Sequence, residues 1–90
     1  MSDGRPWDDT DSGRDARVAA TFGAELRARR LAAGLTQAVV AERAGVHAVT
    51  VSLLERGKRQ PSLGVAFRLS TALGLARTEL AEAVADALGG

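Results

Sequence analysis

Glycines break the chain into short segments of helical periodicity, and this feature restricts the possible folds most strongly. From residue 16 onward, apolar residues recur every three to four positions, and a glycine follows nearly every such segment. Sustained alternation of apolar and polar residues is absent, as is any repeat of fixed period. The sequence therefore predicts an all-α fold, a compact domain of five short helices at 17–33, 37–44, about 48–56, about 63–73 and about 78–88.

Two helix starts and one tight turn are marked by their residue types. Thr36 precedes the second predicted helix and Ser62 precedes the fourth, and both residue types cap helix N-termini through a side-chain oxygen. Gly45, Val46 and His47 form a very short connection between the second and third helices. Glycine permits the positive φ that such a turn requires. The predicted arrangement of these two helices is a helix-turn-helix.

The net charge of +1 conceals an uneven distribution. Residues 1–15 hold five Asp and two Arg and so carry −3, while residues 16–78 hold ten Lys or Arg and three Glu and so carry +7. Residues 79–90 hold two Glu and one Asp, which is −3. We predict a disordered acidic arm at 1–15, which contains Trp7, followed by one domain at 16–90. The basic middle suits either a phosphate backbone or an ordinary solvated surface.

The composition excludes several classes of protein. A chain of 90 residues allows one small domain, and the absence of cysteine excludes disulfides and thiolate metal sites. His47 is the single histidine, and no phosphate-loop motif or Ser–His–Asp constellation with supporting context is present. We therefore expect neither an enzyme nor a cofactor, metal or small-molecule ligand. No apolar run approaches the roughly 18 residues that span a bilayer, so we expect a cytoplasmic protein without a membrane partner.

Several separated motifs carry a resemblance to a known family. They are F-G-x-x-L-R-x-x-R at 22–30, GLTQ at 34–37, AERAGV at 41–46, LERGKRQPSL at 54–63 and ALG at 72–74. With this spacing the chain resembles the Cro and lambda-repressor-like family, also called the XRE family, over roughly residues 22–80. The resemblance implies a sequence-specific regulator of transcription that binds double-stranded DNA at a palindromic operator as a homodimer. It also implies that the third helix, about 47–56, reads the major groove.

Residues that would contact phosphates follow from the same resemblance. Gln37 matches the residue at the start of the second helix that meets a phosphate, where the helix dipole favours an anion. Lys58 and Arg59 match the basic loop that lies along the strand, and Arg56 is a candidate beside them. Thr36 and Ser52 complete the expected phosphate contacts, although Thr36 is first a helix cap. Arg30 and Glu55 match a partly buried ion pair of the family, which is structural.

The resemblance assigns base readout to the start and outer side of the third helix, at His47, Ala48, Val49, Thr50 and Leu53. Here the chain departs from the family, because positions 48, 49 and 53 are usually polar. Apolar groups can still discriminate by packing against the thymine C5-methyl group. The alternative is a protein-interaction module, an antitoxin or adaptor, that uses an apolar face of Val39, Val49 and Leu53 on the same fold.

The last predicted helix carries an apolar stripe of Leu80, Val84 and Leu88, four residues apart. We interpret the stripe as a contribution to the dimer interface, since one helix-turn-helix alone buries little surface on DNA. The stripe could instead pack back on the first and fourth helices. Leu80 suits that second role, whereas Val84 and Leu88 are the better candidates for dimer contacts. A small phage-type repressor or a restriction–modification controller protein fits this profile.

Overall fold

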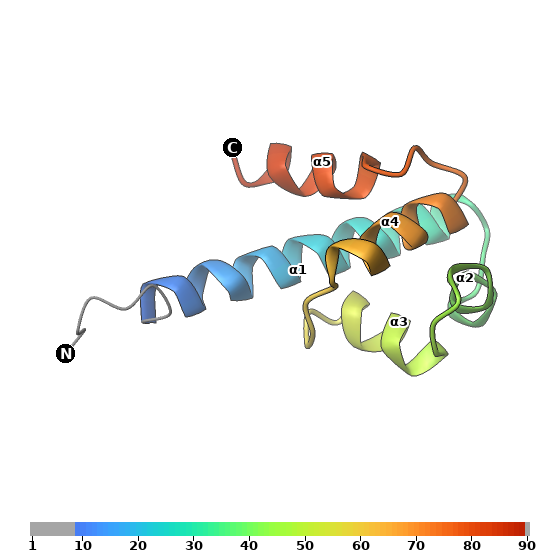
Figure 1. Ribbon diagram of the computed structural model, residues 1–90, viewed down its shortest axis with the longest axis horizontal. Coiled ribbons are helices and arrows are strands. Elements are labelled where there is room, and N and C mark those ends of the chain that lie inside the picture. Colours follow the sequence, from blue (N-terminus) through green and yellow to red (C-terminus); the bar gives the residue numbers. More distant parts are fainter. Residues whose placement is uncertain (1–8, 90) are drawn as a thin grey trace.

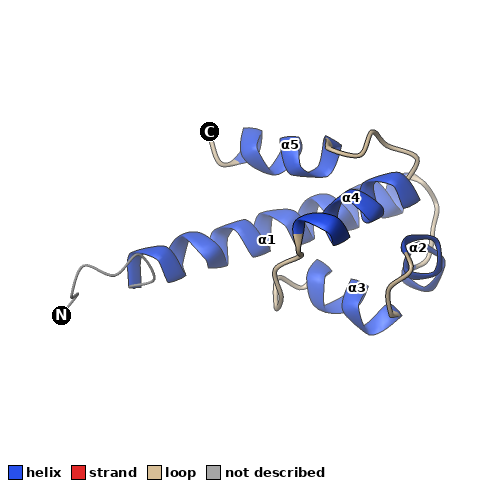
Figure 2. Cartoon of the chain, in the orientation of Figure 1, coloured by secondary structure: helices blue, strands red, loops and turns tan. Residues whose placement is uncertain are grey.

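The structure is a computed structural model, and it describes residues 9–89. Five helices follow one another along the chain: α1 (Asp9–Ala32), α2 (Gln37–Ala44), α3 (Ala48–Glu55), α4 (Leu63–Ala72) and α5 (Glu79–Ala87). Figure 2 shows helices joined by loops, and no strand occurs within the described range. The predicted all-α fold of five helices is confirmed, with α2 at the expected bounds and α3, α4 and α5 shorter by one residue at one or both ends.

The helices pack around α1, which is much the longest (Figure 1). α3 and α5 lie on two sides of α1, while α4 contacts α2 and α5. Each helix contributes a fully buried side chain to one core: Leu26, Val40, Leu54, Leu69 and Leu80 are 0–1% exposed. Burial of each such side chain contributes about 1.5–3 kcal/mol. The core therefore holds α2 and α3 in a fixed orientation against α1 and α4.

Local hydrogen bonds set the helix ends as predicted. The Thr36 hydroxyl accepts a hydrogen bond from the Val39 N–H at 3.1 Å, and the Ser62 hydroxyl accepts one from the Val65 N–H at 3.1 Å. Gly45 adopts a φ of 71°, in the left-handed region, and its N–H donates to the Glu42 carbonyl. The backbone therefore turns within three residues from α2 into α3.

Gly23 lets α1 approach α3 more closely than any larger residue would allow. A Cβ at this position would lie 2.8 Å from the Glu55 carbonyl oxygen and would also meet the Leu54 carbonyl. These contacts are with backbone atoms, which cannot rotate away as a side chain can. The sequence analysis did not identify this close approach.

α1 begins eight residues earlier than predicted, at Asp9 instead of residue 17, so residues 9–15 belong to the helix and not to the predicted arm. Adding turns to an existing helix is much easier than nucleating one, so α1 continues through this polar segment. Figure 1 shows these first turns projecting beyond the other helices. The rest of the predicted arm, residues 1–8 with Trp7, lies outside the described residues.

Candidate nucleic-acid interface

α3 separates into a buried side and an outer side. Val51 and Leu54 are buried in the core, at 0% and 1% exposed. Val49 on the outer side is 68% exposed, so a large apolar side chain does project from the expected reading helix. The exposures of the predicted base-reading residues are uneven: His47, Ala48 and Val49 are exposed, whereas Thr50 and Leu53 are half-buried.

The other predicted contact residues belong to the start of α2 and to the segment that follows α3. Lys58 and Arg59 are both exposed, in the loop between α3 and α4. Arg56 is exposed and its Nε donates to the Ser52 carbonyl at 3.4 Å. Gln37 is the first residue of α2, where the backbone N–H groups have no partner within the helix. The predicted phosphate-contact residues therefore lie at the start of α2, in the last turn of α3 and in the loop that follows α3.

One carboxylate connects three helices beneath this surface. Glu55 of α3 accepts two hydrogen bonds from Arg30 of α1, at 2.6 and 2.9 Å. It also accepts a hydrogen bond at 3.0 Å from the Gln37 Nε2 at the start of α2. The Arg30–Glu55 pair was predicted, but the link to Gln37 was not, because the two residues are 18 positions apart and share no motif. The amide nitrogen of Gln37 is thus already engaged within the protein.

The ionisation of Glu55 reflects these partners. Burial by itself would raise the pKa of the Glu55 carboxyl, because a charged group loses solvation in the core. The hydrogen bonds from Arg30 and Gln37 and the charge of Arg30 outweigh that effect and hold the pKa below its ordinary value. Its side chain is only 3% exposed, so it is a charged structural group and not a surface acid.

The loop that carries Lys58 and Arg59 packs directly against α1. Gln60 Nε2 donates to the Asp15 carbonyl oxygen at 3.3 Å, and Gly57 lies against the Ala20 backbone. The sequence analysis did not identify Gln60 as a contact residue, because the only indication of this role was its position in the basic loop. This hydrogen bond anchors the loop to residues 9–15, the first turns of α1.

The predicted dimer residues on α5 require a correction. Leu80 is 0% exposed and Val84 is 8% exposed, because both side chains pack into the core of the single chain. Leu88 is half-buried and packs against the same core. The apolar surface that remains near α5 is a hollow of about 390 Å³ between α1, α4 and α5, which includes the 65% exposed Leu63. Its other lining residues are Val18, Phe22, Pro61, Ser62, Ala66, Ala81, Val84 and Ala85.

The alternative apolar face is smaller than the sequence suggested. Val39 and Leu53 are half-buried, and only Val49 of the three is strongly exposed.

Over residues 9–89, no helix is long and apolar enough to cross a membrane. The same part of the chain contains no group of three or more His, Asp or Glu side chains arranged to hold a metal ion.

Comparisons with known proteins identify relatives of the helical domain. A family model described as a helix-turn-helix domain matches residues 21–83. An HTH-type transcriptional regulator from Methanothermobacter thermautotrophicus is 47% identical over 49 residues, which are 54% of this chain and 71% of that protein. The matched family region includes all of α2, α3 and α4.

Two solved structures are similar to this chain. The restriction-modification controller protein C.AhdI from Aeromonas hydrophila is 39% identical with a TM-score of 0.66, over 69% of this chain and 94% of that chain. The clp gene regulator ClgR from Corynebacterium glutamicum is 28% identical with a TM-score of 0.71, over 80% of this chain and 77% of that chain.

Proposed function

Because the chain belongs to the XRE-type helix-turn-helix family of DNA-binding transcriptional regulators, we propose that it is a homodimeric repressor or controller protein. In this proposal it acts in the cytoplasm and reads a palindromic operator in double-stranded DNA. The same family membership shows that the chain is not an enzyme.

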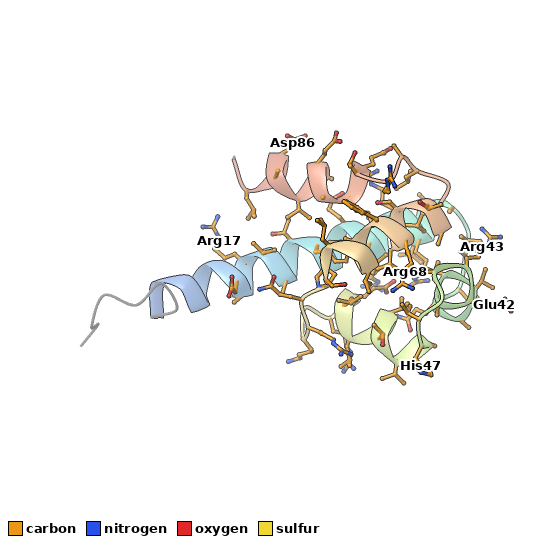
Figure 3. All side chains as sticks on the ribbon, viewed as in Figure 1. Arg17, Glu42, Arg43, His47, Arg68 and Asp86 are labelled. Atoms are coloured by element: carbon orange, nitrogen blue, oxygen red, sulfur yellow. The ribbon has the colours of Figure 1, made fainter. Side chains whose placement is uncertain are left out.

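The observation that carries the proposal is the arrangement of three features on one surface. Gln37 at the start of α2 donates a hydrogen bond to Glu55 of α3, and His47 and Arg59 line one hollow together with Thr50 of α3, so the three features gather on one side of α3. Figure 3 places His47 at the outer edge of that side. Backbone amides and basic side chains would hold the phosphates and fix the register, while α3 enters the major groove.

Base recognition in this proposal depends on apolar contact. His47 and Thr50 supply the polar groups at the start of α3, and Val49 presents its methyl groups to the groove. An apolar side chain packs well on the C5-methyl of thymine and leaves the donors and acceptors of other bases unsatisfied. We therefore expect thymine-rich half-sites.

The proposed dimer uses the hollow between α1, α4 and α5. Leu63 is 65% exposed there and Ala85 is exposed beside it, so this surface remains free after the core has formed. Exposed apolar surface of this kind is typical of interaction sites. Two copies related by a twofold axis would place their half-sites about 10–10.5 bp apart.

The first test measures binding to the duplex upstream of the chain's own gene, by fluorescence anisotropy at several salt concentrations. Each lost phosphate contact lowers the salt slope by about 0.9. We expect the variant Lys58→Ala/Arg59→Ala to lose about two units of slope. The matched control is Arg17→Ala/Arg27→Ala, which removes the same charge from exposed positions of α1. Equal losses in both variants would refute the proposed docking.

A second test addresses the apolar readout directly. Replacing thymine by uracil in the half-site removes only the C5-methyl group, which is worth about 0.8 kcal/mol when buried against an apolar partner. We expect this replacement to weaken binding of the parent protein and to have little effect on Val49→Ala. A uracil effect of the same size in both proteins would show that Val49 does not contact the methyl group.

The second candidate function is a protein-interaction module, an antitoxin or adaptor. The observation that favours it is the 68% exposure of Val49, since an exposed valine can equally contact a protein. In that case Val49→Asp would abolish a protein complex, and the parent chain would show no salt-dependent affinity for duplex DNA.

A further inference from the structure

Three arginines converge on one small hollow whose lining includes none of the predicted DNA-contact residues. The hollow has a volume of about 170 Å³ and is lined by Arg43, Phe67, Arg68, Thr71 and Arg77. Arg43 belongs to α2, Arg68 to α4 and Arg77 to the connection between α4 and α5. All three arginines are exposed, and Phe67 between them is half-buried.

These arginines lack acidic partners in the part of the chain that the structure describes. Arg43 Nη1 reaches the Ala72 carbonyl at the long distance of 3.5 Å, and the Arg77 guanidinium lies 5.8 Å from the centre of the Phe67 ring. By contrast, Arg29 and Arg30 are both in ion pairs, with Glu79 and Glu55. The charges of Arg29 and Arg30 are therefore neutralised, whereas the arginines around Phe67 have no acidic counter-ion among the described residues.

The chemistry of the hollow selects for carboxylates beside an apolar group. A guanidinium binds a carboxylate through two parallel hydrogen bonds. Three guanidinium groups within one site repel each other, and a bound anion relieves that repulsion. The ring of Phe67 offers an apolar surface between the charges. The volume is well below the roughly 300 Å³ of pockets for small organic ligands, so one side chain fills it.

The location of the hollow favours a protein ligand over DNA. Figure 3 shows Arg43 and His47 on opposite sides of α2. Along α2, Arg43 is six positions from Gln37, which places the two side chains about 120° apart around the helix axis. A duplex keeps its base faces stacked and exposes its apolar thymine methyl groups only within the major groove, so its phosphate backbone places nothing apolar on Phe67. We propose that Arg43, Arg68 and Arg77 around Phe67 form a docking site for an acidic segment of a protein partner that carries an apolar side chain among its carboxylates.

The test uses a twelve-residue peptide of aspartate and glutamate with one central leucine, and a matched peptide in which every acid is replaced by its amide. The full chain labelled with ¹⁵N is titrated with each peptide, and amide shifts are followed by NMR. We expect saturable shifts in residues 66–78 with the acidic peptide only. The variant Arg43→Ala/Arg77→Ala should bind it at least roughly tenfold more weakly, as expected for lost charge-assisted hydrogen bonds.

The control Arg17→Ala/Arg27→Ala removes the same charge elsewhere and should keep its affinity for the peptide. Equal weakening of both variants would overturn the proposal, because the attraction would then be general. Shifts confined to the loop at Lys58 and Arg59, or a loss of duplex affinity in Arg43→Ala/Arg77→Ala, would also overturn it in favour of a DNA contact. Arg68→Glu reverses one charge at an exposed position, so it tests the site even if the double variant is destabilised.

Discussion

Glu55 illustrates how a single residue holds the proposed interface together. It accepts hydrogen bonds from both Arg30 and Gln37, and Arg30 also donates to the Leu35 carbonyl at 2.9 Å. Replacing Glu55 by Gln leaves the Arg30 charge without its counter-ion at a position where the arginine side chain is 11% exposed. We expect the free energy of unfolding to fall by about 2–3 kcal/mol, somewhat less than for a fully buried pair. Urea denaturation measures this loss, and an unchanged midpoint would contradict it.

The same residue predicts how stability depends on pH. The folded pKa of Glu55 lies below its ordinary value of 4.5, so the charged form is favoured by folding. Its contribution to stability is complete well above pH 4.5 and is lost as the pH falls below that value. Denaturation midpoints measured from pH 7 to pH 3 should therefore fall less steeply in Glu55→Gln than in the parent. Parallel curves would contradict the prediction.

Gly23 gives a residue-scale prediction with an internal control. A methyl group there meets backbone atoms of α3, so Gly23→Ala should destabilise the protein by about 1–3 kcal/mol, as other overpacked sites do. Gly13 lies in the same helix with no heavy atom within 4 Å of the added Cβ. Gly13→Ala should be neutral or stabilising by up to about 1 kcal/mol, because alanine is the better helix former. Equal effects of the two changes, compared by thermal unfolding, would refute the close approach.

At the scale of elements, α1 combines a packed part and a projecting part. From Val18 onward α1 contributes to the core, whereas its first turns project beyond the other helices (Figure 1), where the Gln60 side chain donates to the Asp15 carbonyl. Amides near residue 15 should exchange with solvent at least roughly 100-fold faster than those of residues 22–30, since local opening there breaks few contacts. Hydrogen exchange measured by NMR tests this, and uniform protection along α1 would contradict it.

The elements also show what the sequence could predict. The bounds of α2 and both hydroxyl caps depend on local chemistry, and they were predicted correctly. The start of α1 was predicted wrongly, because a helix can continue through a polar segment that would not form a helix alone. The stripe on α5 was ambiguous for another reason: Leu80 and Val84 have the same spacing whether they face their own core or a second copy. Only the packing of α5 against α1 and α4 shows that the stripe faces the core of its own chain.

At the scale of the whole molecule, the proposed dimer depends on the hollow between α1, α4 and α5. Leu63→Glu would place a charge in that apolar surface and should shift the protein from dimer to monomer in sedimentation experiments, because an unpaired charge is costly to bury. Leu31→Glu is the matched control, since Leu31 is 56% exposed on α1 and does not line the hollow. An unchanged dimer in Leu63→Glu would exclude this hollow as the interface.

The hydrogen bond between Gln37 and Glu55 has a consequence for binding kinetics. The Gln37 side chain is already hydrogen-bonded to Glu55 before any duplex arrives, so we expect much of the entropy of ordering it to be lost during folding and not during association. Fixing such a side chain at an interface otherwise costs about 0.5–1.5 kcal/mol. The start of α2 and α3, the proposed reading helix, are also joined through one carboxylate, so we expect them to approach the duplex as a rigid unit. We therefore expect rapid capture of the operator, with the lifetime of each complex set by how well the bases match α3.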